Sequence, residues 1–98
     1  MEKLIISEQD IVNAICIYLS RKYQARPEEV EVELIFDDEE ENGFSAEAFV
    51  GGQKQNLLTI HIIEALRLWI DEVLNKDPLA AGIKLLFDED EGIIAAIH

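Results

Sequence analysis

Hydrophobic and polar residues follow two patterns along this chain, and each pattern occurs twice. Apolar residues recur every three or four positions from about residue 8 to 24, and again from about 57 to 75, which is the spacing of an amphipathic helix. Each of these segments is followed by two runs in which apolar and polar residues alternate, as is typical of strands. The sequence therefore predicts two helices, each followed by a β-hairpin. The strands are expected at residues 30–36, 44–50, 83–87 and 93–97.

Short local signals indicate where these elements begin and end. Ser7 followed by Asp10 resembles a capping box at the start of the first helix. Pro27 ends that helix, because a residue before proline avoids the helical conformation. Asn56 is a candidate N-cap for the second helix. Residues 51–55, Gly-Gly-Gln-Lys-Gln, are the only stretch that resembles a linker.

The second half of the sequence resembles the first half when the chain is shifted by 51 residues, and by 49 after the acidic turn. The matches are mostly of residue class, and such periods should be sought before a fold is assigned. The main aligned segments are Ile11–Ile15 with Ile62–Leu66, Glu33–Asp38 with Lys84–Glu89, and Gly43–Ala46 with Gly92–Ala95. We therefore interpret the chain as two αββ repeats, at about residues 7–50 and 57–98.

Two αββ units in series indicate an α+β fold in a single domain, residues 1–98. Neither half, at roughly 50 residues, could bury its own apolar face, so the halves are expected to share one core. The simplest closure is a four-stranded antiparallel sheet with both helices packed on one face.

The face of that sheet turned away from the helices is expected to be unusually apolar. Four large residues lie on it by alternation: Ile35, Phe49, Leu86 and Ile94. A solvated face of an antiparallel sheet is normally polar, so we interpret these residues as an interface. The expected partner is a second copy of the chain, because twofold dimers are the commonest oligomers. The alternatives are scattered exposed residues, or a cover formed by residues 1–6.

Composition and charge exclude several classes of function. The chain has 98 residues, of which 49% are apolar, and a formal net charge of −13. This apolar share is normal for a folded domain, whereas the charge opposes binding to nucleic-acid phosphates and to anionic membranes. No apolar run approaches the roughly 20 residues that cross a bilayer, and the first residues resemble no signal peptide. With a single cysteine, Cys16, the chain is expected in the reducing cytoplasm.

Two acidic turns, residues 37–41 and 88–91, occupy matching places in the two halves. Clustered carboxylates could bind a hard cation such as calcium. The candidate ligands are Asp37, Asp38, Asp88 and Asp90. Neither turn has the spacing of a calcium-binding loop, so solvated turns are the favoured interpretation. The alternatives are weak binding of a divalent cation and docking of a basic partner protein.

No combination of residues in the sequence indicates catalysis or a cofactor. His61 and Glu64 lie three residues apart on one helix face, but they are too few for a metal site and are expected to face solvent. Cys16, at the edge of a core stripe, is expected to be inert. Glu47 is the acid most expected to be partly buried, with Lys84 as its ion-pair partner. We therefore expect no cofactor and no enzyme activity.

The opening of the chain reads Ser7-Glu8-Gln9-Asp10-Ile11-Val12-Asn13-Ala14. This segment, together with the chain length and the two hairpins, resembles the YxcD-like proteins. That family comprises short uncharacterised cytoplasmic proteins of spore-forming Gram-positive bacteria, classed as a domain of unknown function. The resemblance implies a small bacterial cytoplasmic domain, and it transfers no active-site residues.

The function itself stays unknown from the sequence. We expect a small acidic cytoplasmic protein that acts by protein–protein binding, as a homodimer and without catalysis. One alternative is an acidic adaptor or inhibitor that covers a basic surface on a partner. The other is a weak divalent-cation-binding domain that uses the acidic turns.

Overall fold

The computed structural model describes residues 4–39, 43–79 and 82–98, which form two α-helices and two three-stranded antiparallel sheets. The helices are α1 (Glu8–Lys22) and α2 (Thr59–Glu72). The first sheet has the order β2–β3–β4, with strands Val30–Phe36, Phe44–Val50 and Gln53–Leu57. The second sheet has the order β1–β6–β5, with strands Leu4–Ile6, Gly92–Ile97 and Ile83–Asp88. A short 3-10 helix, Pro27–Glu29, leads into β2.

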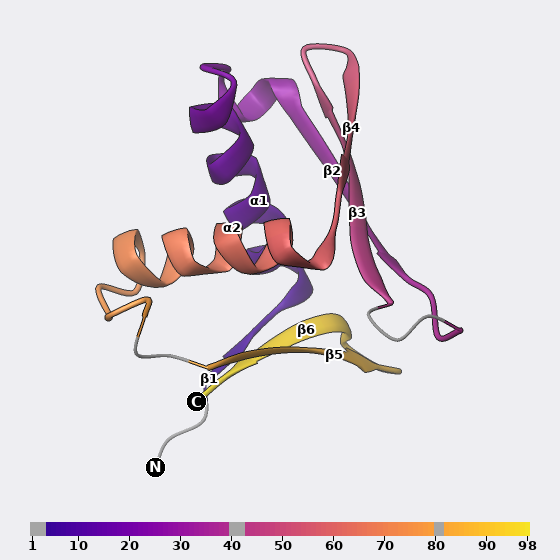
Figure 1. The fold of residues 1–98 in the computed structure, drawn as a ribbon, viewed down its shortest axis with the longest axis vertical. Helices are drawn as coiled ribbons and strands as arrows, with labels where there is room; N and C mark the ends of the chain where they lie inside the picture. The colour runs from indigo at the N-terminus through magenta and orange to yellow at the C-terminus, as the bar shows by residue number, and fades with distance from the viewer. Residues whose placement is uncertain (1–3, 40–42, 80–81) are drawn as a thin grey trace.

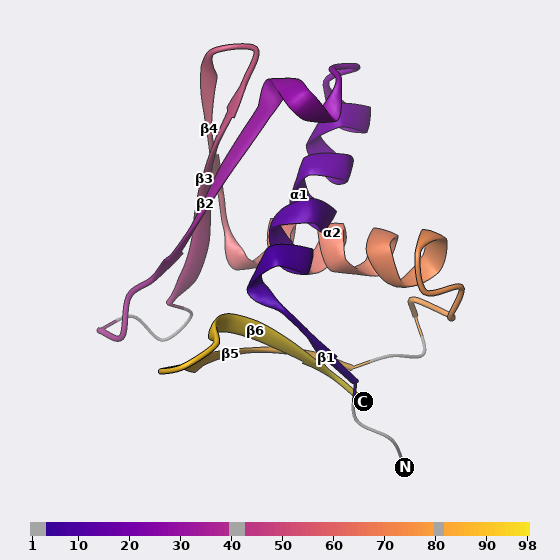
Figure 2. The ribbon, with the colours of Figure 1, turned by 180° about the vertical axis from the view of Figure 1, so that it is seen from behind.

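The predicted α+β class and both predicted hairpins are present, but the predicted four-stranded sheet is wrong. The hairpins β2–β3 and β5–β6 do not pair with each other, and each gains its third strand from the other half of the chain. Figures 1 and 2 show the two helices in the angle between the two sheets, so the helices do not lie together on one face of a single sheet.

Strand β4 occupies the segment that the sequence favoured as a linker. Gly51 and Gly52 have φ values of +56° and +85°, the left-handed conformation that a two-residue hairpin turn requires and that glycine adopts without strain. The chain therefore reverses and pairs along β3, with Val50 opposite Gln53. The sequence pattern did not predict this strand, because an edge strand needs few apolar residues and β4 is mostly polar.

The start of α2 also differs from the prediction, because strand β4 extends up to it. Asn56 belongs to β4, and Leu58 is the N-cap residue. Since Leu58 has no polar side chain, His61 takes over part of the capping: its Nδ1 accepts a hydrogen bond of 2.9 Å from the Leu58 N–H. At the start of α1 the predicted cap is confirmed, because Ser7 Oγ accepts a bond of 3.2 Å from the Asp10 N–H.

Strand β1 joins the first residues of the described chain to the last strand. Its register sets Leu4 opposite Ile97 and Ile6 opposite Ala95. Ile6 is buried in the core, while Ile5 points to the other side of the sheet and is 49% exposed. Residues 4–6 therefore extend the second sheet and do not cover it; residues 1–3, the rest of the cover that the sequence left as an alternative, lie outside the described residues.

A single core lies where the helices meet the inner sides of both sheets. The largest fully buried side chains are Ile11, Ile15, Leu19, Ile62, Leu66 and Ile70. The small residues Ala46, Ala48 and Ala95 are buried on the strands and leave room for the helices. Neither helix in the described part of the chain is long and apolar enough to cross a membrane.

Candidate functional site

The four residues expected at an interface lie on two different sheets. Ile35 and Phe49 belong to β2 and β3, on the side of the first sheet that faces away from the helices. Leu86 and Ile94 pair directly across β5 and β6, on the corresponding side of the second sheet. The structure thus divides the predicted set into two surfaces on different sheets.

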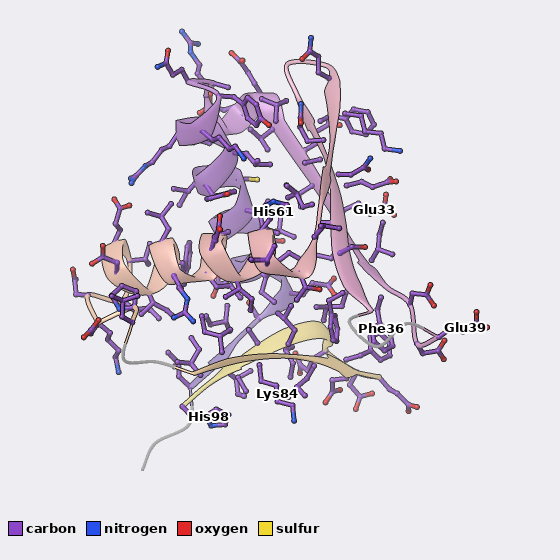
Figure 3. The ribbon with its side chains drawn as sticks, in the orientation of Figure 1. Glu33, Phe36, Glu39, His61, Lys84 and His98 are labelled. Atoms are coloured by element: carbon purple, nitrogen blue, oxygen red, sulfur yellow. The ribbon has the colours of Figure 1, made fainter. Side chains whose placement is uncertain are left out.

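The outer side of the second sheet carries an apolar patch that we call the open face. Its residues are Ile5, Lys84, Leu86, Ile94 and Ala96. Lys84 and Ile5 flank Ala96, which is completely enclosed, and Leu86 and Ile94 are half-buried beside them. Figure 3 shows Lys84 on the side of the sheet away from both helices. The open face therefore combines four apolar side chains with one cation.

The corresponding side of the first sheet is mostly polar. Glu33 lies opposite Glu47 across β2 and β3, and Figure 3 shows Glu33 pointing away from the helices. The Nζ atom of Lys54 lies 3.0 Å from Glu47 Oε1. The predicted ion pair between Glu47 and Lys84 is wrong, because these two residues belong to different sheets.

A groove that the sequence analysis did not identify lies where β2 and β3 meet the start of α2. Its volume is about 540 Å³, and its apolar lining is Ile35, Phe44, Leu58 and Ile60. Leu58 and Ile60 are 62% and 61% exposed. The available signal was the position of Ile60, which falls off the core-facing stripe of its helix. This groove gives the first sheet an apolar surface of its own at the start of α2.

In each acidic turn, an aspartate carboxylate accepts hydrogen bonds from backbone N–H groups of the same turn. Asp37 Oδ1 accepts a hydrogen bond of 3.0 Å from the Glu39 N–H. Asp88 Oδ1 accepts bonds of 2.8 and 3.1 Å from the N–H groups of Asp90 and Glu91. These bonds are the local side-chain-to-backbone contacts that stabilise tight turns.

The predicted metal ligands are not drawn together. Asp38 and Asp90 are exposed, and residues 40–42 of the first turn lie outside the described residues. Within residues 4–39, 43–79 and 82–98, no group of three or more His, Cys, Asp or Glu side chains is arranged to hold a metal ion.

Two exposed phenyl rings connect the ends of the two sheets beside these turns. The rings of Phe36 and Phe87 stack with centroids 4.9 Å apart and planes 8° apart. Phe44 packs against Phe36 at 4.8 Å. Phe87 stays 53% exposed. Figure 3 shows Phe36 and Glu39 at this shared end, where the acidic turns flank an aromatic pair.

Polar contacts also join the two helices. The Tyr18 hydroxyl donates a hydrogen bond of 2.8 Å to Glu64 Oε2, and Arg21 forms an ion pair with Glu72. Burial, and then the bond to Glu64, raises the pKa of Tyr18 to about 12. Glu64 therefore has a structural contact, as His61 has at the N-cap of α2.

Cys16 fits its expected role as an inert thiol. Its Sγ atom lies 3.9 Å from the Val30 carbonyl oxygen. Burial raises the pKa of the Cys16 thiol, which disfavours the nucleophilic thiolate at neutral pH.

Comparisons with known proteins agree with the resemblance found in the sequence. Residues 1–90 match the family described as "Protein of unknown function (DUF2653)". The chain is 35% identical over 96 residues to "Uncharacterized protein YxcD" of Bacillus subtilis (strain 168), an alignment that covers 97% of this chain and 92% of that relative. No solved structure matches the chain. The YxcD-like resemblance is thereby confirmed, and the chain belongs to the DUF2653 family of proteins of unknown function.

Proposed function

We propose that this chain is a cytoplasmic protein-binding domain that associates with a second copy of itself through the open face and has no catalysis of its own. The observation that carries the proposal is the composition of that face. Four of its five side chains are apolar, and both helices lie on the other side of the sheet (Figures 1 and 2). Ile5 is 49% exposed, and Leu86 and Ile94 are half-buried; accessible apolar side chains grouped in this way mark interaction sites.

The proposal also treats the two halves of the chain as structural repeats. Strand pairing supports this, because positions that match at offsets of 51 and 49 residues occupy matching places in the two sheets. In the second sheet, Ala95 on the central strand pairs with Ile6 on one side and Leu85 on the other. In the first sheet, the matching residue Ala46 pairs with Leu57 and Leu34 in the same way. The ion pair Arg21–Glu72 and the ring pair Phe36–Phe87 each join residues 51 positions apart.

On this basis the outer sides of the two sheets can be compared position by position. The matched pairs, first sheet then second, are Asn56 and Ile5, Glu47 and Ala96, Glu33 and Lys84, Ser45 and Ile94, and Ile35 and Leu86. Four of the five positions in the first sheet are polar, so the fold itself accepts polar side chains there. The fold therefore does not explain why the second sheet has apolar residues at these positions. Contact with a partner would explain it.

Charge favours the open face as the meeting place of two identical chains. Two molecules that each carry −13 repel one another. This side of the second sheet carries the cation Lys84 and, at the end of β5, the carboxylate of Asp88, so its local charges balance and repulsion is weakest there. Three short strands make a small face compared with about 800 Å² per partner in a typical stable complex. We therefore expect association that depends on protein concentration.

A charge placed on the open face tests the proposal. We expect the wild-type chain to reach twice the 11.1 kDa of one copy as its concentration rises, and Leu86→Glu to stay monomeric, since the interface would bury an unpaired carboxylate. The matched control is Ile35→Glu, at the corresponding position of the first sheet, which should dimerise like the wild type. Native mass spectrometry across a dilution series gives both masses. Equal dimerisation of the two variants would contradict the proposal.

A second candidate function is docking of a basic partner protein at the aromatic end of the sheets. The observation that favours it is the exposed Phe36–Phe87 pair between two acidic turns, since aromatic faces and carboxylates both attract Lys and Arg side chains. Such binding would weaken as salt is added. Self-association should instead strengthen with salt, because screening reduces the repulsion between two acidic chains. The direction of the salt effect on any complex separates the two candidates.

A further inference from the structure

We infer that, in the homodimer proposed above, strand β5 of each copy packs face to face and antiparallel with β5 of the other, so that Lys84 of each copy meets Asp88 of the second copy. Leu86 then lies on the twofold axis. The inference rests on the proposed self-association, and it adds a register and an orientation that can be tested separately.

The order of side chains along β5 carries the inference. Lys84, Leu86 and Asp88 are spaced by two residues within the strand Ile83–Asp88, so they point to the same side of the sheet. Read in one direction they form the series cation, apolar, anion. A twofold axis through the middle member reverses the series, so that each cation meets an anion and the two leucines meet each other. A twofold interface needs this self-complementarity.

Lys84 has no ion-pair partner among the residues that the structure describes. Among the described residues no carboxylate lies within 4.0 Å of its Nζ atom, whereas Lys54 pairs with Glu47 and Arg21 with Glu72. Asp88 and Lys84 are four residues apart on one strand, roughly 13 Å at the usual rise per residue, and therefore do not pair with each other. Lys84 is thus a cation on an apolar surface, and a carboxylate from a second copy of the chain could form an ion pair with it.

Asp88 is suitably placed to supply that carboxylate. Both of its bonds to the turn, from the N–H groups of Asp90 and Glu91, are accepted by Oδ1. The other oxygen, Oδ2, has no hydrogen-bond partner among the described residues. These bonds fix the carboxylate at the end of β5, so that little side-chain entropy is lost when it meets a lysine from the second copy.

Two charge reversals test this register. Lys84→Asp places two carboxylates opposite each other twice in every dimer, and Asp88→Lys does the same with two ammonium groups. We expect each variant alone to dimerise at least about tenfold more weakly than the wild type. Mixed in equal amounts, the two variants should form a heterodimer. In it the carboxylates at positions 84 and 88 of one chain face the ammonium groups at positions 88 and 84 of the other, so every contact is again between opposite charges. Native mass spectrometry resolves the three dimers by mass.

Matched controls separate local pairing from net charge. Lys76→Asp and Glu89→Lys change the total charge by the same amounts at two exposed positions. Neither should abolish the dimer, and their mixture should show no preference for the heterodimer. If Asp88→Lys disrupts its turn and fails to fold, Asp88→Asn keeps an oxygen for the turn bonds while it removes the charge. That variant should still weaken the dimer, and an unchanged affinity would overturn the inference.

The outcomes distinguish this inference from the proposal on which it rests. A wild-type chain that stays monomeric would overturn both. A wild-type dimer that Leu86→Glu disrupts, with no heterodimer preference in the mixture of charge variants, would leave the self-association standing and show the proposed register to be wrong.

Discussion

Substitution of Gly92 by alanine should destabilise the protein well beyond the cost of an ordinary turn substitution. Gly92 begins β6 with a φ of +79°, and a Cβ atom added there would collide with Glu8 Oε2. That oxygen accepts a hydrogen bond of 2.7 Å from the Ile93 N–H. The bond joins the start of α1 to the start of the last strand, residues 85 positions apart.

The expected cost has two parts. Holding alanine in a left-handed conformation costs about 1–2 kcal/mol. The Glu8 side chain is exposed and free to move away, but the buried Ile93 N–H then loses a charged acceptor, which is worth about 1.5–3 kcal/mol. The sum is about 2.5–5 kcal/mol. For a domain of this size, that loss lowers Tm by roughly 10–40 °C.

Urea unfolding followed by the fluorescence of Trp69, the single tryptophan, measures the loss. Gly52→Ala is the matched control, since Gly52 has a similar φ of +85° with no atom within 4 Å of an added Cβ. It should cost only the conformational part. In a Glu8→Ala background, Gly92→Ala should likewise cost only about 1–2 kcal/mol. Equal losses for Gly92→Ala and Gly52→Ala would refute the role given to the Glu8 contact.

Two further predictions concern the edge of the core and the helix contact. Ile6→Ala should lower the free energy of unfolding by about 2–3 kcal/mol at every protein concentration, since Ile6 is 3% exposed. Ile5→Ala should cost less than Ile6→Ala in dilute protein and should also weaken the concentration-dependent part, since Ile5 is 49% exposed; equal effects in dilute protein would contradict the assigned sides of β1. The pKa of Tyr18 is raised to about 12 in the folded chain, whereas an unperturbed tyrosine has a pKa near 10. The neutral phenol therefore stabilises the fold fully at pH values below about 10. This contribution should disappear as pH rises from about 10 to 12. A pH titration of absorbance at 295 nm should show this late ionisation, and Tyr18→Phe should remove it.

The helices and hairpins could be predicted because their sequence signals are local and strong. The stripe that includes Ile11, Ile15 and Leu19 reports the buried side of α1 directly. The Ser7 cap and the alternation through β2 are equally explicit. Such signals depend on contacts between near neighbours in the chain, so one sequence is enough to read them.

Strands β1 and β4 were missed for different reasons: the partner of β1 lies far away in the sequence, whereas β4 lies next to its partner β3 but is made mostly of polar residues. β1 has only three residues and pairs with β6 at the opposite end of the chain. β4 begins with polar residues and reads as a linker, although pairing with β3 on one side is enough to hold it. Without these two strands, the simplest closure of the two hairpins was a single sheet.

The same omission affected the candidate interface. Alternation correctly set Leu86 and Ile94 on one side of their hairpin and Ile35 on the outer side of the other. It could not reveal that these sides belong to separate sheets. It also left out Ile5, since its place on the open face depends on the pairing of β1 with β6.

The oligomeric state of the wild-type chain tests the central claim most directly. Sedimentation velocity in 0.5 M sodium chloride, across a hundredfold range of protein concentration, would measure it with the repulsion between acidic chains largely screened. We expect the mass to rise from 11.1 kDa towards twice that value as concentration increases. A single species of 11.1 kDa at every concentration would contradict the proposed self-association through the open face.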